Sequence, residues 1–197
     1  MSTGTPRIVL ASTSRYRADL LRRVLPVFEQ AAPQVEETAI ANEAPRRRAE
    51  RLALLKAAAI AHGCDDAIVV GSDQVAELDG LVFDKPGDFA RAQAQLTACS
   101  GREVHFHTAV CVIDTRKRDH RALATDLTRV RFRDLMPQEI DRYLEREQPF
   151  DCAGSFKTEA LGITLFERID SNDPTALIGL PLIALARLLR ECGLALP

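Results

Sequence analysis

The stretch IVVGSDQV, residues 68–75, changes character halfway along its length. Residues 68–70 are three β-branched side chains in a row, which predicts a buried strand. Residues 71–74 are a glycine followed by a serine, an aspartate and a glutamine. A solvated turn would explain these polar side chains. The edge of an active site would also explain them, because open α/β sheets bind ligands outside the carboxyl ends of their strands.

Helices and strands alternate around this strand in the first half of the chain. Helix caps, apolar periodicity and turn residues mark their limits. The pattern predicts a strand at 8–10, a helix capped by Ser14, a polar loop at 33–44, a helix from Pro45 to Gly63, a hairpin at Asp79–Gly80, and a helix from Asp88 to Gly101.

Longer strands are predicted in the second half. Residues 103–114 and 122–133 alternate in polarity as two strands, but the apolar alternation slips between Leu127 and Val130, which predicts a β-bulge. The remaining expected elements are a helix from Pro137, a strand at 161–169 and a helix at 181–192. The expected fold class is α/β, with a mixed, strongly twisted sheet and flanking helices.

The composition is that of an ordinary soluble protein. The 197 residues suffice for one domain, or a two-lobed domain, with a sizeable core. A net charge of -2 gives no general attraction to nucleic acid or to an anionic membrane, and no apolar run approaches a membrane span. The start lacks the layout of a signal peptide. Five cysteines without a close pair argue against a disulfide framework or a zinc knuckle and favour the cytoplasm.

Residues 10–17, LASTSRYR, hold a candidate anion site. Ser12, Thr13 and Ser14 lie between a predicted strand and a predicted helix, and Arg17 falls in the first turn of that helix. Free backbone N–H groups, hydroxyls and an arginine at a helix N-terminus together bind anions. A serine-rich cap beside a solvated arginine explains the same residues.

Other candidate side chains are isolated in the sequence. Lys56 lies four residues after Leu52 on the predicted inner face of its helix, where it either snorkels to solvent or points into a polar cleft. Glu37 and Lys85, each taken alone, are better explained as surface charge.

No standard phosphate-binding or zinc motif is present. His105 and His107 share a strand face, but no third ligand is placed near them, so we interpret them as ordinary strand residues. The block CAGSFKTEALGI, residues 152–163, is unusual because four notable residues precede a predicted strand: Gly154, Ser155, Lys157 and Glu159.

Taken together and in order, these motifs resemble those of the Maf family of nucleotide pyrophosphatases. They are LASTSRYR, RLALLKA, IVVGSDQV, DKP, CSG, AGSFKTEALGI and DPTALIGLP, and they extend from Ile8 to about Gly193. GSDQ and AGSFKTE resemble the branch that acts on 7-methyl-GTP, since the branch acting on dTTP and UTP usually has GADT and a later glutamine. Three residues depart from the family pattern: Arg15 replaces a proline, and Asp84 and Ala109 each replace a glycine.

The resemblance implies a single two-lobed domain over residues 1–197, with a cleft between the lobes and a fold shared with inosine-triphosphate pyrophosphatases. It also implies a divalent cation (Mg²⁺, Mn²⁺ or Co²⁺) and often a homodimer. The implied reaction hydrolyses 7-methyl-GTP to 7-methyl-GMP and pyrophosphate, which removes a modified nucleotide from the pool. The alternatives are a dTTP/UTP or broad-specificity pyrophosphatase and a nucleotide-binding regulator of cell division.

Roles for individual residues follow from the same resemblance. Asp73 would be the general base, or the metal-linked carboxylate that orients the attacking water, and Glu37 would share the metal. The phosphate-binding residues would be Ser12, Arg17, Lys56 and Lys85. A carboxylate beside three cations favours an enzyme over a pure binder, because a binder gains nothing from a negative charge next to phosphates.

Base choice is assigned by resemblance to Tyr16, Gln74 and Glu159. Glu159 can accept hydrogen bonds from the N1–H and N2 amine of guanine, and the face of Tyr16 suits a ring made cationic by N7 methylation. Gln74 can donate and accept at the base or the ribose. Gly71 would let the backbone approach the ligand closely.

Overall fold

The computed structural model describes residues 6–117 and 120–197, and seven strands within them form one mixed sheet. Six strands follow the order β2–β1–β3–β5–β6–β7, and β4 pairs with β3 outside this path. The strands are β1 (Arg7–Ala11), β2 (Glu29–Ala31), β3 (Ala67–Leu78), β4 (Leu81–Phe83), β5 (Glu103–Asp114), β6 (Arg121–Phe132) and β7 (Phe166–Asp170).

The pairing of the strands is parallel at one edge and antiparallel elsewhere. β1 runs parallel to β2 and to β3, whereas β3, β5, β6 and β7 are successively antiparallel. Leu78 pairs with Leu81, so the predicted hairpin at Asp79–Gly80 is confirmed. The expected mixed α/β sheet is therefore confirmed, with β3 at its centre.

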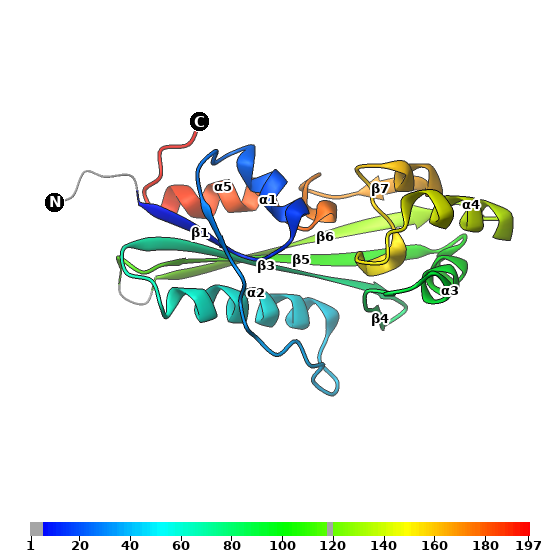
Figure 1. Cartoon of the computed structure of the whole chain (residues 1–197), viewed down its shortest axis with the longest axis horizontal. Helices are drawn as coiled ribbons and strands as arrows, with labels where there is room; N and C mark the ends of the chain where they lie inside the picture. Colours follow the sequence, from blue (N-terminus) through cyan, green and yellow to red (C-terminus); the bar gives the residue numbers. More distant parts are fainter. Residues whose placement is uncertain (1–5, 118–119) are drawn as a thin grey trace.

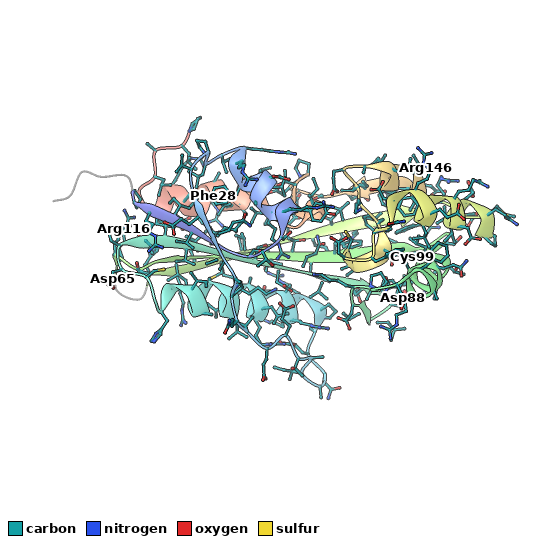
Figure 2. All side chains as sticks on the ribbon, in the orientation of Figure 1. Phe28, Asp65, Asp88, Cys99, Arg116 and Arg146 are labelled. Carbon is teal, nitrogen blue, oxygen red and sulfur yellow. The ribbon has the colours of Figure 1, made fainter. Side chains whose placement is uncertain are left out.

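Helices cover both faces of this sheet (Figure 1). On one face lie α1 (Arg15–Arg22) and α5 (Leu182–Glu191), and on the other lies α2 (Pro45–Ala61). At the far end of the long strands, α3 (Phe89–Cys99) and α4 (Pro137–Glu147) enclose a third hydrophobic cluster. Figure 2 shows Cys99 at this end, where its side chain is fully buried.

Local chemistry explains where the helices begin. The side chains of Ser14 and Asp88 accept hydrogen bonds from the third residues of α1 and α3, as their predicted cap roles require. Pro45 occupies the first turn of α2, where its missing N–H costs no hydrogen bond.

All five cysteines are free thiols. No helix among the described residues is long and apolar enough to cross a membrane.

The β-bulge predicted between Leu127 and Val130 is wrong. β5 and β6 pair without a break from Glu103↔Arg131 to Ile113↔Arg121. The alternation slips in the sequence because Asp126 and Thr128 occupy inward positions, where both are buried. Their polar groups are satisfied there, since the hydroxyls of Thr128 and Ser171 each donate to the Asp126 carboxylate. The β6 irregularity lies instead on its β7 side.

The strand predicted at 161–169 is only partly correct. Residues Leu161–Leu165 form a short 3-10 helix, and the strand begins at Phe166. The N–H of Gly162 donates to the carbonyl of Lys157 at 3.0 Å, and that of Leu161 to the Glu147 carboxylate at 3.2 Å. The backbone N–H groups of residues 161 and 162 are thus already bonded and cannot pair with an adjacent strand.

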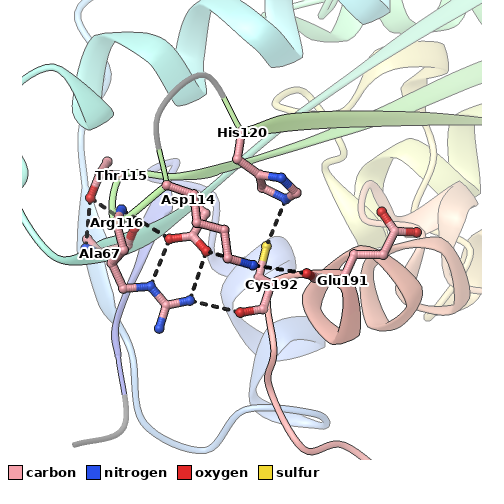
Figure 3. Close-up of polar contacts among 8 residues, drawn as sticks. Ala67, Asp114, Thr115, Arg116, His120, Glu191 and Cys192 are labelled. Atoms are coloured by element: carbon pink, nitrogen blue, oxygen red, sulfur yellow. Dashed lines mark hydrogen bonds and ion pairs between the residues drawn. The ribbon is translucent and has the colours of Figure 1, made fainter. Parts of the chain in front are cut away.

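The β5–β6 turn is tied to the end of α5 by a polar cluster (Figure 3). Arg116 donates two 2.8 Å hydrogen bonds to the buried carboxylate of Asp114 and one of 2.9 Å to the carbonyl of Cys192. The ring of His120 lies 3.5 Å from the Cys192 sulfur. Burial raises the pKa of Asp114, but its bonds to Arg116 outweigh this and lower the pKa overall.

Gly71 serves helix packing rather than the ligand approach that the sequence suggested. A Cβ added at this position would lie 2.6 Å from the backbone nitrogen of Ala57 and would also clash with the carbonyl of Ala53. The buried alanines of α2 recur every four residues at Ala49, Ala53 and Ala57, so α2 lies unusually close to β3. The glycine therefore fixes the separation between α2 and β3.

We expect Gly71→Ala to destabilise the protein by about 1–3 kcal/mol, the usual cost of overpacking a core. At this chain length that corresponds to a fall in Tm of roughly 2–4 °C for each kcal/mol. Thermal unfolding followed by circular dichroism would measure it. Gly63→Ala is the matched control, because its nearest neighbouring atom would be 3.9 Å away. Equal Tm values for parent and Gly71→Ala would contradict the close helix contact.

Candidate active site

A cleft of about 800 Å³ opens beside the centre of β3. It is lined by the β1–α1 connection, one face of α2, the middle of β3, the segment after β4 and the segment around the short helix η1 (Ala153–Ser155). All nine predicted site residues line it: Ser12, Tyr16, Arg17, Glu37, Lys56, Asp73, Gln74, Lys85 and Glu159. Segments far apart in the sequence thus converge on one cavity, although the roles of their side chains remain predictions.

Lys56 and Asp73 form a buried ion pair at the floor of the cleft. The Lys56 Nζ lies 2.6 Å from Asp73 Oδ1 and 2.8 Å from Glu37 Oε1. Lys56 and Asp73 are each only 6% exposed, whereas Glu37 is exposed at the rim. Lys56 therefore points into a polar cleft and does not snorkel to solvent.

The close contact at Gly71 explains this pairing. Lys56 precedes Ala57, the α2 residue that touches Gly71, and Asp73 lies two residues beyond that glycine on β3. Glu37 comes from the irregular segment between β2 and α2. Burial raises the pKa of the Glu37 carboxyl, but the hydrogen bond and charge of Lys56, with the charges of Lys85 and Arg17, lower it overall.

Arg17 also lines the cleft, from the first turn of α1. Its Nε donates to the carbonyl of Gly179 at 2.9 Å, which leaves the other guanidinium donors to serve the cleft. Burial lowers the pKa of Arg17, and the carboxylates of Asp73 and Glu37 oppose that shift. The neighbouring Ser12 is buried, and its hydroxyl oxygen accepts from the N–H of Ser14 at 3.1 Å. The residues of the predicted anion site thus line the cleft, and their role in binding an anion stays a prediction.

Lys85 and its neighbour Asp84 lie at the exposed rim after β4. Asp84, which replaces a glycine of the family pattern, is paired with Arg48, at 3.2 Å from the arginine Nη2. Arg48 lines the cleft from α2 and was not predicted. The signal that would have found it is its spacing, since Arg48, Leu52 and Lys56 recur every four residues on one helix face.

The other departures from the family pattern have local structural roles. The carbonyl of Ala109 accepts the hydroxyl of Ser72 at 2.7 Å, so this position contributes its backbone. Arg15 donates to the hydroxyl of its neighbour Tyr16 at 2.8 Å, and its guanidinium carbon lies 4.8 Å from the Tyr16 ring centroid. A cationic base was expected to stack on the Tyr16 ring, and this ring is already in contact with the guanidinium group of Arg15.

The remaining base-choice candidates differ in how firmly they are held. The amide nitrogen of Gln74 lies 3.0 Å from the carbonyl oxygens of Ala176 and Leu177, so contact with a base would use its amide oxygen, an acceptor. Glu159 is exposed at the rim beside η1. Two cleft residues in the same segment, Asp151 and Cys152, were not predicted.

The two strand histidines lie outside this cleft. His105 bonds the carboxylates of Glu77 and Glu103, at 2.9 Å and 3.2 Å. Across residues 6–117 and 120–197, no group of three or more histidine, cysteine, aspartate or glutamate side chains is placed to hold a metal. His105 is therefore engaged by two carboxylates of the chain, and the interpretation of both histidines as ordinary strand residues stays a prediction.

The fold and the cleft define an α/β protein whose site brings five basic and five acidic side chains to one cleft, among them the buried Lys56–Asp73 pair. The sequence model of the family described as "Maf-like protein" matches residues 7–192, and the chain belongs to this family.

Two relatives of similar sequence agree with that assignment. A 7-methyl-GTP pyrophosphatase of Xanthomonas oryzae pv. oryzae (strain MAFF 311018) is 58% identical over 98% of this chain and 100% of its own length. A protein of the same name from Aromatoleum aromaticum is 53% identical over 97% and 98%. Among solved structures, a HAM1 protein from Coxiella burnetii aligns with a TM-score of 0.46 at 18% identity, covering 65% of this chain and 73% of that one.

We expect Lys56→Met to lower stability strongly, because it leaves the Asp73 carboxylate buried without its cation. Breaking a buried ion pair typically costs about 3–5 kcal/mol. Chemical denaturation would measure the loss, and adding Asp73→Asn to Lys56→Met should recover part of it. Lys85→Met, at an exposed position, is the control for loss of a cleft cation. An unchanged free energy of unfolding in Lys56→Met would contradict the buried pair.

Proposed function

We propose that the protein is a nucleoside triphosphate pyrophosphatase whose preferred substrate is 7-methyl-GTP. The observation that supports this most directly is the buried Lys56–Asp73 pair, which shares with Arg17 a cleft large enough for a nucleotide. The names of relatives more than 50% identical over nearly the whole chain support the choice of substrate.

The proposed reaction is attack of water on the α-phosphorus, which yields 7-methyl-GMP and pyrophosphate. One oxygen of Asp73 is engaged with Lys56, so the other is available to orient the water and accept its proton. Arg17, Lys56 and Lys85 offset the negative charge of the triphosphate and stabilise the charge that grows on the transferred group. Ser12 contributes a hydroxyl at the same end of the cleft.

A divalent cation fits the donors that this cleft offers. Glu37 and Asp73 supply carboxylate oxygens around the same lysine nitrogen. Mg²⁺ and similar ions commonly bind through one or two carboxylates, together with waters and substrate phosphates. When bound, the ion would screen the phosphates and polarise the bond that breaks.

Recognition of the base is assigned to Tyr16, Gln74 and Glu159, which all line the cleft. The Glu159 carboxylate and the amide oxygen of Gln74 are acceptors, which suits the N1–H and N2 amine of guanine and opposes the carbonyl oxygens of uracil or thymine. The face of Tyr16 attracts a cation, as its contact with Arg15 illustrates. A methylated, cationic guanine would compete for the same face.

Asp73→Asn is expected to lower kcat/KM for 7-methyl-GTP by about 10²–10⁴-fold, the typical contribution of a general base. Pyrophosphate release would be measured with Mg²⁺, Mn²⁺ and Co²⁺ over a panel that includes GTP, UTP and dTTP. Asp65→Asn, an exposed aspartate in the turn before β3, is the matched control (Figure 2). Turnover by Asp73→Asn at the parent rate would show that Asp73 has no role in catalysis.

Tyr16→Ala should lose more kcat/KM on 7-methyl-GTP than on GTP, because cation–π attraction is worth roughly 0.5–2 kcal/mol. Tyr16→Phe, which keeps the ring and lacks only the hydroxyl bound by Arg15, should retain the preference. Glu159→Gln should narrow the gap between 7-methyl-GTP and the pyrimidine nucleotides. Equal losses on all substrates would mean that these side chains support the fold and do not select the base.

A further inference from the structure

Arg48 is a cation of the cleft to which nothing above assigns a function. Its side chain is only 15% exposed, and it lines the cavity from α2. Two turns of the same helix face separate it from Lys56, with Leu52 between them on the cavity wall. Its partner Asp84 immediately precedes Lys85, so Arg48 stands between two of the proposed phosphate-binding lysines.

The hydrogen bonding of Arg48 is incomplete. Its Nε is buried and has no hydrogen-bond partner among the described residues. Its contact with Asp84 is a hydrogen bond of 3.2 Å to a carboxylate that is 77% exposed. By contrast, Arg51 on the same helix holds Glu43 with two hydrogen bonds of 2.6 and 2.7 Å. A buried donor without an acceptor is costly, so the observed contacts do not explain why an arginine side chain is buried at this position.

A phosphate group would supply the acceptors that Arg48 lacks. The guanidinium presents its donors in a planar fork that matches two phosphate oxygens, and such bidentate pairs are stronger than single hydrogen bonds. The exposed carboxylate of Asp84 places a negative charge at the mouth of the nucleotide-free cleft. A polyphosphate entering the cleft brings more charge and more acceptors than Asp84 does.

We propose that Arg48 is a further phosphate-binding residue, held by Asp84 in the free protein and transferred to the terminal phosphates of the bound nucleotide. This inference rests on the proposed function and adds a fourth cation to Arg17, Lys56 and Lys85. Asp84 then acts as a competitor that the phosphates displace. The opposing explanation is that the Arg48–Asp84 pair only fixes the position of the segment carrying Lys85.

The two explanations predict opposite effects of removing Asp84. If Asp84 competes with phosphate, Asp84→Ala should tighten binding. If the pair only positions Lys85, Asp84→Ala should weaken binding as Arg48→Ala does. Because Asp84→Ala also removes a negative charge beside Lys85, the double variant is needed. A gain that acts through Arg48 must disappear when Arg48 is absent.

Isothermal titration calorimetry with inorganic pyrophosphate and Mg²⁺ tests this on the full chain. We expect Arg48→Ala to raise Kd about tenfold, the order of a hydrogen-bonded charge contact. Asp84→Ala should lower Kd by up to about fivefold, which is the strength of an exposed ion pair. In the Arg48→Ala background, Asp84→Ala should have no such effect. Arg47→Ala, a 78% exposed arginine of the same helix, is the control and should match the parent.

The outcomes separate this inference from the proposed function. An unchanged Kd in Arg48→Ala, or a weaker one in Asp84→Ala, overturns the role of Arg48 alone. An equal gain from Asp84→Ala in both backgrounds also overturns it, since the gain would then act through Lys85. A parent that binds pyrophosphate with the expected pattern but hydrolyses no triphosphate overturns the proposed function alone. A parent that binds no pyrophosphate overturns both.

Discussion

The close contact between α2 and β3 at Gly71 is the constraint on which the site depends. Side chains on two packed elements usually keep them far enough apart for a core layer to fill the gap. Here a glycine faces Ala53 and Ala57, so the two backbones approach directly. Lys56, which precedes Ala57 in the same turn of the helix, is then in contact with Asp73, two residues along the strand, although both are polar and nearly buried.

Each cation of the cleft has a different set of partners in the protein. Lys56 serves two carboxylates at once, and its pull lowers the pKa of Glu37. Arg17 loses proton affinity through burial and depends on those carboxylates to recover part of it. Arg48 has an exposed acid as its partner and an unbonded buried nitrogen. Phosphates would give these cations the acceptors that the protein alone does not provide.

Much of the fold and of the cleft could be predicted from local chemistry. Caps such as Ser14 and Asp88 and the turn at Asp79–Gly80 fix element ends through contacts within a few residues. The errors involve partners distant in the sequence. Gly71 was assigned to a ligand because its true neighbours, Ala53 and Ala57, lie on another element. The polar Asp126 at an inward position was interpreted as a bulge, because the hydroxyl of Ser171 that bonds it lies far away in the sequence. Arg48, one of three consecutive arginines, was not singled out in the sequence because its partner Asp84 lies 36 residues away.

Hydrolysis of 7-methyl-GTP in ¹⁸O-labelled water tests the central claim most directly, because it reports which phosphorus the water attacks. In the proposed reaction, Asp73 and its water act at the α-phosphorus, and the other two phosphates are held among the cations. Mass spectrometry of the products should therefore find one ¹⁸O atom in 7-methyl-GMP and none in pyrophosphate. Label in pyrophosphate, or release of orthophosphate in its place, would contradict this arrangement of the cleft.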